Sequence, residues 1–194
     1  IYDEDRLNIN KVLAKFKRRL TDEELFYNLC FCICAPQTKF SSNLKVIADL
    51  KSKDFFNKNI EINDLTEIIR PVRFLRKAKY LLVAKRTFDH VLQILQLPKD
   101  GKFKRNILVK DVIGMGMKAA SHFLRNQGYE DLAIIDTHII KFLKIETFKM
   151  NKKGYEIAEV MFQEYADYYN LSIAALDIYL WKIYSKTNWE DFIY

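Results

Sequence analysis

The chain has 194 residues and carries 32 Lys or Arg against 25 Asp or Glu, which gives a net charge of +7. A hydrophobic content of 49% excludes a disordered or fibrous protein, and the length allows one or two domains with a substantial core. The longest uncharged stretch, residues 25–38, is too short to span a bilayer, and the first residues lack the pattern of a signal peptide. We therefore expect a soluble, intracellular protein.

Helices are predicted along the whole chain. Five Gly and three Pro supply too few turn residues for a β-sandwich or a β-barrel, whereas apolar residues repeat at helical spacing. Thr21, followed by three acidic residues, predicts a capping box that opens a helix before Leu25. We expect about ten helices, no strand and an all-α fold.

Three cysteines, Cys30, Cys32 and Cys34, lie inside one apolar segment. At a spacing of two they cannot all share one helical face, and no histidine is near them. Zinc sites and cysteine-ligated iron–sulfur clusters usually need about four ligands at other spacings. We therefore expect buried, reduced thiols and no metal site.

Basic residues are concentrated in two segments. Residues 68–88 contain no acidic side chain and seven basic ones, which are Arg70, Arg73, Arg76, Lys77, Lys79, Lys85 and Arg86. The second segment contains Lys102, Lys104, Arg105 and Lys110. Clustered cations favour binding to a phosphate backbone through counterion release. A solvated, lysine-rich surface is the alternative, and charge alone does not separate the two.

The segment over residues 107–126 contains two of the five glycines, Gly114 and Gly116, followed by a helix predicted over residues 117–124. This pattern predicts a helix-hairpin-helix, in which glycines allow close approach to a phosphate and helix amides point at it. A plain helix–turn–helix connection is the alternative. Lys118 lies in the first helical turn, where the helix dipole disfavours a cation. Its role is either that of a nucleophilic amine or that of a contact to phosphate.

Asp136 follows an apolar run, eighteen positions after Lys118, and precedes a helix predicted over residues 137–144. Its simplest role is that of a helix N-cap. Capping leaves one carboxylate oxygen free, so Asp136 can also face a cleft. A later helix is expected over residues 153–170, with one apolar face formed by Ala158, Met161, Phe162, Tyr165, Ala166 and Tyr169.

These motifs together resemble the helix-hairpin-helix superfamily of base-excision DNA glycosylases. More narrowly, the run GMGMKAASHFLRNQGYEDLAIIDTHI is similar to the archaeal-type 8-oxoguanine DNA glycosylase/AP lyases. The resemblance implies two helical lobes with an active-site cleft between them. One lobe covers residues 21–134 with a hairpin at about 112–118, and the other combines residues 1–20 with 135–194. It also implies a monomeric DNA-repair enzyme that acts on duplex DNA containing 8-oxoguanine without a cofactor or metal.

The family's functional residues match positions of this chain. Lys118 aligns with the Schiff-base lysine and Asp136 with the catalytic aspartate, which implies excision through an imine followed by β-elimination. The positions that match the pocket for the flipped base are Phe74, Asp177 and Trp181. Gln37 resembles the residue that fills the gap left by the extruded nucleotide. The other expected DNA contacts are Gly114, Gly116, Arg73, Arg76 and Lys77.

Some of these assignments have simpler alternatives. Phe74 and Trp181 would then be core aromatics, and Gln37 a surface residue at a helix end. Two positions depart from the family pattern, because Thr137 stands where an arginine is frequent and Tyr194 where the family has a lysine that helps to recognise the damaged base.

Two other functions stay open. An endonuclease-III-like glycosylase for oxidised pyrimidines usually carries a four-cysteine cluster near its C-terminus, and this sequence has no cysteine after Cys34. A non-catalytic helix-hairpin-helix module would bind DNA through the hairpin and the basic residues and would need neither Lys118 nor Asp136.

Overall fold

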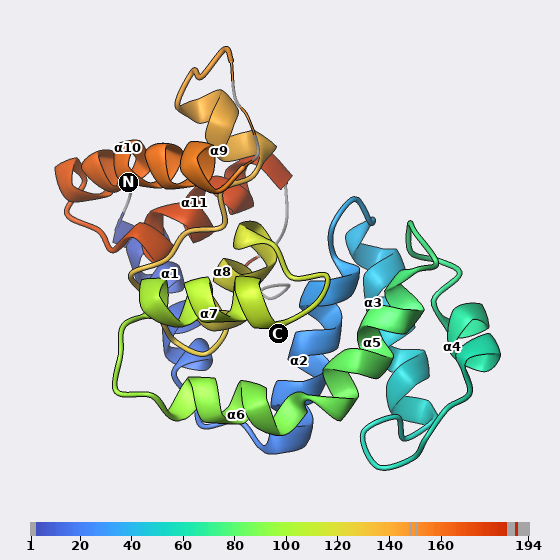
Figure 1. Cartoon of the computed structure of the whole chain (residues 1–194). Helices are drawn as coiled ribbons and strands as arrows, with labels where there is room; N and C mark the ends of the chain where they lie inside the picture. Colours follow the sequence, from blue (N-terminus) through green and yellow to red (C-terminus); the bar gives the residue numbers. More distant parts are fainter. Residues whose placement is uncertain (1–2, 148, 150, 186–188, 190–194) are drawn as a thin grey trace.

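The computed structural model describes residues 3–147, 149, 151–185 and 189. Within these ranges all the regular secondary structure is helical, as the composition predicts, with eleven α-helices and no strand (Figure 1). The helices are α1 (Asp3–Phe16), α2 (Asp22–Cys34), α3 (Phe40–Ser52), α4 (Ile62–Ile68), α5 (Lys77–Arg86), α6 (Phe88–Gln96), α7 (Gly101–Asp111), α8 (Met117–Arg125), α9 (Thr137–Phe142), α10 (Lys152–Tyr168) and α11 (Ile173–Ser185). Among the described residues, no helix is long and apolar enough to cross a membrane.

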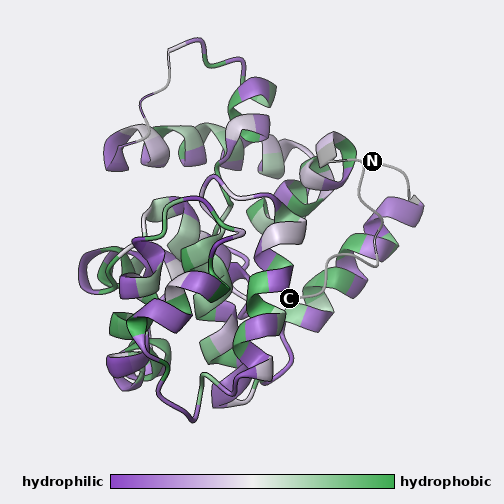
Figure 2. Cartoon of the chain, turned by 90° about the vertical axis from the view of Figure 1, so that its right-hand side faces the viewer, coloured by the Kyte–Doolittle hydropathy of each residue, from purple (hydrophilic) through white to green (hydrophobic). Residues whose placement is uncertain are grey.

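Three clusters of buried side chains hold the helices together. The largest cluster contains residues between 26 and 132 and forms the common core of helices α2 through α8. The second joins α9, α10 and α11, and the third packs α1 against α11. The N-terminal helix therefore lies beside the C-terminal helices, as the dark-blue and red ribbons in Figure 1 show. Apolar and polar residues alternate along the same helices in Figure 2, which gives each helix an inner and an outer side.

The capping box at the start of α2 is confirmed. The Glu24 amide donates to Thr21 Oγ1 at 3.2 Å, and the Thr21 amide donates back to Glu24 Oε2 at 2.8 Å. Arg18 also donates to this carboxylate at 2.8 Å. These bonds, that from Arg18 most of all, lower the pKa of Glu24 to about 2. The beginning of α2 is therefore determined by local sequence.

Two predicted helices differ in detail from the observed ones. The helix after Asp136 ends at Phe142 instead of residue 144, because Lys144 adopts the left-handed backbone conformation with φ 54°. On α10, Ala158, Phe162 and Ala166 are buried as expected, and Met161 is half-buried. The expectation that the apolar face includes Tyr165 and Tyr169 is wrong. Both are exposed, because the buried side of α10 consists of Tyr155, Ala158, Glu159, Phe162 and Ala166.

All three cysteines are free and buried, as predicted. Burial raises the pKa of each thiol, that of Cys34 to about 12, so the thiols stay protonated at neutral pH. The Cys32 thiol donates to Asn28 Oδ1 at 3.6 Å. These cysteines therefore behave as small core residues.

Candidate active site

The predicted hairpin joins α7 to α8. After α7 ends, the Met115 amide donates to the Val112 carbonyl at 3.1 Å and closes a turn. Gly114 has φ +83°, and a Cβ atom at this position would collide with the ring of Tyr80. Gly114 is therefore required by the fold itself.

Gly116 differs from Gly114. It is the N-cap of α8 with φ −90°, a value that other residues adopt readily, and a Cβ atom there would meet nothing within 4 Å. The expectation that both glycines supply an unusual backbone conformation is thus correct only for Gly114. A group placed at position 116 would therefore meet open space at the N-terminus of α8, the end of a helix that favours an anion.

A charge at position 116 tests this anion site. Asp and Asn are equally good N-caps, so Gly116→Asp and Gly116→Asn are both expected to fold with wild-type stability or better. Only the aspartate repels a phosphate at the helix N-terminus. In a DNA titration at low salt we expect Gly116→Asp to bind about tenfold more weakly than Gly116→Asn. Equal DNA affinities of the two variants would show that the N-terminus of α8 does not contact DNA.

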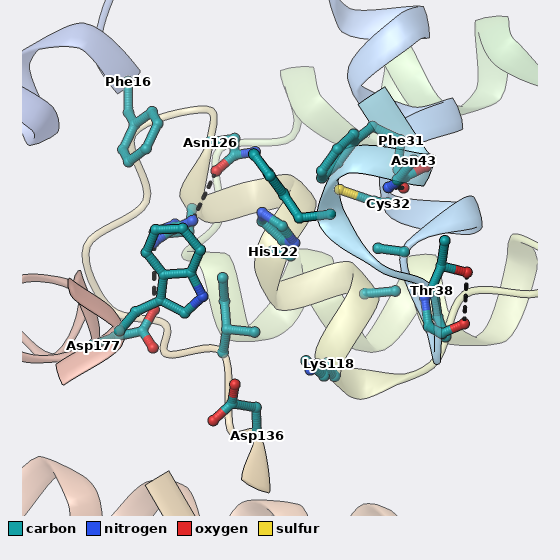
Figure 3. Close-up of a pocket in the computed structure, with 17 residues that line it drawn as sticks. Phe16, Phe31, Cys32, Thr38, Asn43, Lys118, His122, Asn126, Asp136 and Asp177 are labelled. Carbon is teal, nitrogen blue, oxygen red and sulfur yellow. Dashed lines mark hydrogen bonds and ion pairs between the residues drawn. The ribbon is translucent and has the colours of Figure 1, made fainter. Parts of the chain in front are cut away.

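A cavity of about 190 Å³ opens beside the hairpin (Figure 3). Its walls come from α1, α2, α3, α8, α11 and the segments around residues 35–38 and 134–136. Four predicted site residues line it together: Lys118, Asp136, Asp177 and Trp181. Its other polar side chains are Cys32, Thr38, Asn43, His122, Arg125 and Asn126, and its other aromatic ones are Phe16, Phe31 and Phe40.

Lys118 and Asp136 lie at the same end of the cavity in Figure 3. Lys118 is exposed in the first turn of α8, as predicted. Asp136 is the N-cap of α9, and its Oδ1 accepts the amides of His138 at 2.8 Å and Ile139 at 3.1 Å. Because both bonds use Oδ1, the second carboxylate oxygen is available to a ligand in the cavity. The N-cap and cleft roles are therefore compatible.

Asp177 is buried in the wall of the cavity with only 4% of its surface exposed. Arg125 Nη1 lies 3.4 Å from its Oδ2, and Arg125 Nη2 donates to Asn126 Oδ1 at 3.2 Å. Burial raises the pKa of Asp177 to about 7, although the Arg125 guanidinium opposes this increase; the Asp136 carboxylate adds to it. Asp177 can therefore both donate and accept hydrogen bonds near neutral pH.

Several residues of this wall had no predicted role. His122 meets Phe31 edge to face with ring centroids 5.7 Å apart, and burial holds the pKa of His122 well below its usual value. The rings of Phe40 and Trp181 also meet edge to face, with centroids 6.2 Å apart. His122 and Arg125 fall within the sequence run that carries the family resemblance, and this run was the available signal for them.

Phe74 and Gln37 are not among the residues that line the cavity. Phe74 is 38% exposed with φ 69°, and the guanidinium groups of Arg73 and Arg76 lie over its ring at 5.1 and 5.0 Å. Gln37 is exposed with φ 56°, between the lining residues Pro36 and Thr38, so it lies near the cavity but not in its wall.

Several of the basic residues bind groups inside the protein, among them Lys77, Lys104, Arg105 and also Lys85, whose ammonium donates to the carbonyls of Phe55, Phe56 and Lys58. Lys77 is 4% exposed, and its ammonium donates to Cys34 O at 2.7 Å, Pro36 O at 2.8 Å and Thr38 Oγ1 at 3.2 Å. The expectation that Lys77 contacts phosphate is therefore corrected, because all three of its protons hold the loop after α2. Lys104 donates to Leu95 O and to the hydroxyl of Tyr129, and Arg105 is 2% exposed. Arg73 and Arg76 stay exposed.

Comparison with known proteins identifies the family of this chain. A family profile described as 8-oxoguanine DNA glycosylase matches residues 9–171. The chain belongs to this family. A Picrophilus torridus protein named 8-oxoguanine DNA glycosylase/AP lyase is 34% identical over 186 residues, covering 90% of this chain and 87% of that protein. Its counterpart in Methanocaldococcus jannaschii is 28% identical over 181 residues, covering 89% and 87%.

Solved structures show the same helical fold. The crystal structure of the M. jannaschii 8-oxoguanine DNA glycosylase aligns with a TM-score of 0.83 and 29% identity, covering 95% of this chain and 90% of that one. The complex of the M. jannaschii enzyme with a 15mer DNA containing 8-oxoguanine aligns with a TM-score of 0.82 and covers 92% and 90%. The all-α, helix-hairpin-helix architecture is thus confirmed.

Proposed function

We propose that this chain excises 8-oxoguanine from duplex DNA through an imine on Lys118 and then cleaves the strand. Family membership supports the glycosylase and lyase activities. The observation that carries the chemistry is the placement of Lys118 and Asp136 at one end of a shared cavity, each at the start of a different helix.

The proposed reaction begins when the lesion rotates out of the stack into the cavity. The neutral amine of Lys118 bonds to C1′ of the sugar while the glycosidic bond breaks, and the electron pair leaves with the base, which takes up a proton. The Asp136 carboxylate stabilises the positive charge that develops on the sugar. One proton of the attached amine then passes by way of solvent to the ring oxygen O4′ as the C1′–O4′ bond breaks, which leaves a protonated imine between Lys118 and C1′. Removal of a proton from C2′ expels the 3′ phosphate and cleaves the strand.

Three features support the proposed DNA interface. Gly116 is exposed beside open space at the N-terminus of α8, and Arg73 and Arg76 are exposed cations. We place the cleft between two lobes, residues 21–134 and residues 1–20 with 135–194. The separate core of residues 26–132 and the packing of α1 on α11 support this division. We further propose that the enzyme acts as a monomer on DNA inside the cell.

Asp177 and Trp181 are the proposed contacts of the flipped base. They lie four residues apart on α11 and line the same cavity. A carboxyl group near its pKa can accept from or donate to a purine edge, and the indole offers an aromatic face. Tyr194, which stands where the family has a lysine, lies outside the described part of the chain.

The titration of Asp177 predicts a pH dependence of stability. Between pH 4 and 7 the unfolded chain has lost this proton while the folded protein keeps it, so stability falls as pH rises. The slope from this group is at most about 1.4 kcal/mol per pH unit. Urea unfolding across this range is expected to show a shallower decline for Asp177→Asn than for the wild type. Parallel curves would mean that Asp177 does not retain its proton on folding.

Borohydride trapping tests the proposed activity. The wild-type protein is expected to form a covalent complex with duplex DNA carrying 8-oxoguanine and none with the undamaged duplex. A pyrimidine glycosylase would instead trap on thymine glycol and ignore 8-oxoguanine. A non-catalytic module would bind DNA and trap on neither, and either result would overturn the proposal.

A further inference from the structure

A buried ion pair links the hairpin to the C-terminal helices. The two terminal nitrogens of Arg105 on α7 bind the two carboxylate oxygens of Glu159 on α10, at 2.5 and 2.8 Å. Their side chains are only 2% and 4% exposed. Such a pair costs desolvation free energy, and apolar side chains of similar size often stabilise a core equally well. Stability alone therefore does not account for it.

The hydrogen bonds continue from this pair to the segment before Asp136. Arg105 Nη1 donates to Ser121 Oγ at 3.1 Å, and Ser121 Oγ lies 3.1 Å from the hydroxyl of Tyr155. That hydroxyl donates to the Ala133 carbonyl at 2.7 Å and accepts the Ile135 amide at 3.1 Å. All members of this network are buried.

The protons available in the network fix which group donates in each hydrogen bond. A phenol has one proton, and the Ala133 carbonyl can only accept, so the Tyr155 proton goes to Ala133. The serine proton then makes the contact between Ser121 and Tyr155, while Ser121 Oγ accepts from Arg105. Every hydrogen bond on this path can be made with a single set of protons, and within the described residues only the buried Nε of Arg105 is left without a partner on the path. The network therefore has one preferred arrangement.

Two members of the network lie close in sequence to the two proposed catalytic residues. Ser121 is one helical turn after Lys118 on α8, and Ile135 directly precedes Asp136. We propose that Tyr155 and Ser121 are positioning residues that hold the Lys118 wall of the cleft in register with the Asp136 wall. Neither side chain lines the cavity. Tyr155 acts through the backbone groups of Ala133 and Ile135 that it binds, and Ser121 acts by joining the Tyr155 hydroxyl to α8. This inference rests on the proposed roles of Lys118 and Asp136.

The segment that carries Asp136 depends on this contact. Ala133 and Ile135 are fully buried, and the segment containing them lies outside any helix, so their backbone groups need partners from elsewhere. The Tyr155 hydroxyl serves both groups. Without it, the loop before α9 can shift relative to α8, and a displacement of about 1 Å costs up to ~100-fold in a rate that needs aligned groups.

The test compares Tyr155→Phe with Tyr27→Phe. Tyr27 is also a buried phenol whose hydroxyl accepts a backbone amide, that of Phe56 at 3.2 Å, but it lies away from the cavity. Single-turnover excision, borohydride trapping, DNA affinity and thermal stability are measured for both variants on duplex DNA with 8-oxoguanine. We expect Tyr155→Phe to slow excision and trapping roughly tenfold or more with unchanged DNA affinity. Tyr27→Phe should lose comparable stability and retain the wild-type rates.

Several outcomes would overturn the positioning role. Wild-type rates in Tyr155→Phe, or equal rate losses in the two variants, would make the hydroxyl merely structural. If Tyr155→Phe does not fold, Ser121→Ala interrupts the same path with a smaller change and is expected to slow excision likewise; wild-type rates in that variant would also overturn the proposal. Failure of the wild-type protein to trap 8-oxoguanine DNA would instead refute the proposed function, so the two failures are distinguishable.

Discussion

Replacement of Lys118 by glutamine is expected to abolish borohydride trapping and strand cleavage on 8-oxoguanine DNA. An amide cannot form the imine, whereas the hairpin amides, Arg73 and Arg76 are unchanged, so the variant should retain much of its DNA affinity. Removing a cation from the first turn of α8 should also stabilise the helix by about 0.3–1 kcal/mol. Loss of activity with equal or higher thermal stability is therefore the expected combination.

Lys110→Gln is the matched control for this experiment. Lys110 is an exposed lysine in the last turn of α7, on the other arm of the hairpin, and it does not line the cavity. Its replacement should reduce the slope of log DNA affinity against log salt concentration by no more than about one unit, and it should leave borohydride trapping intact. Trapping that persists in Lys118→Gln would show that another amine is the nucleophile.

Asp136→Asn is expected to slow excision by a factor of about 10² to 10³ while the protein stays folded and binds damaged DNA. Asparagine caps a helix as well as aspartate does, so the bonds to the amides of His138 and Ile139 survive. What disappears is the negative charge that offsets the developing cation on the sugar. A loss of about 3–4 kcal/mol is typical for such an electrostatic group. Single-turnover kinetics with the damaged duplex measure the effect.

Asp100→Asn serves as the control for the capping role. Asp100 is the N-cap of α7, where its side chain accepts the Phe103 amide at 2.7 Å, and it is exposed away from the cavity. This variant should match Asp136→Asn in stability and excise at the wild-type rate. A comparable rate in the two variants would reduce Asp136 to a structural cap.

Local features of the fold could be predicted from the sequence because they depend on neighbours within one helical turn. The capping box at Thr21 is an example, since its bonds join residues three apart. The same holds for Asp136 as an N-cap and for Lys118 in the first turn of α8. The family resemblance placed both residues in one site, and the structure brings them to one cavity.

The partners of the buried charges could not be predicted, because they come from distant parts of the chain. Lys77 belongs to a basic segment that resembles a phosphate-binding surface, yet its ammonium binds carbonyl groups 41 and 43 residues away. Arg105 likewise pairs with Glu159, 54 residues further on. Sequence patterns report the number of charges in a segment but not which of them turn inward.

The helical class and the capped helix starts could thus be predicted from the residues alone, and the family resemblance predicted that Lys118 and Asp136 share a site. The side chains that surround these two residues follow from the packing of separate helices. This packing places Phe74 outside the cavity and brings in Arg125 and His122 instead. The physical reason is that helix formation follows spacing along the chain, whereas burial, shifted pKa values and hydrogen-bond partners depend on how separate helices pack across a shared core.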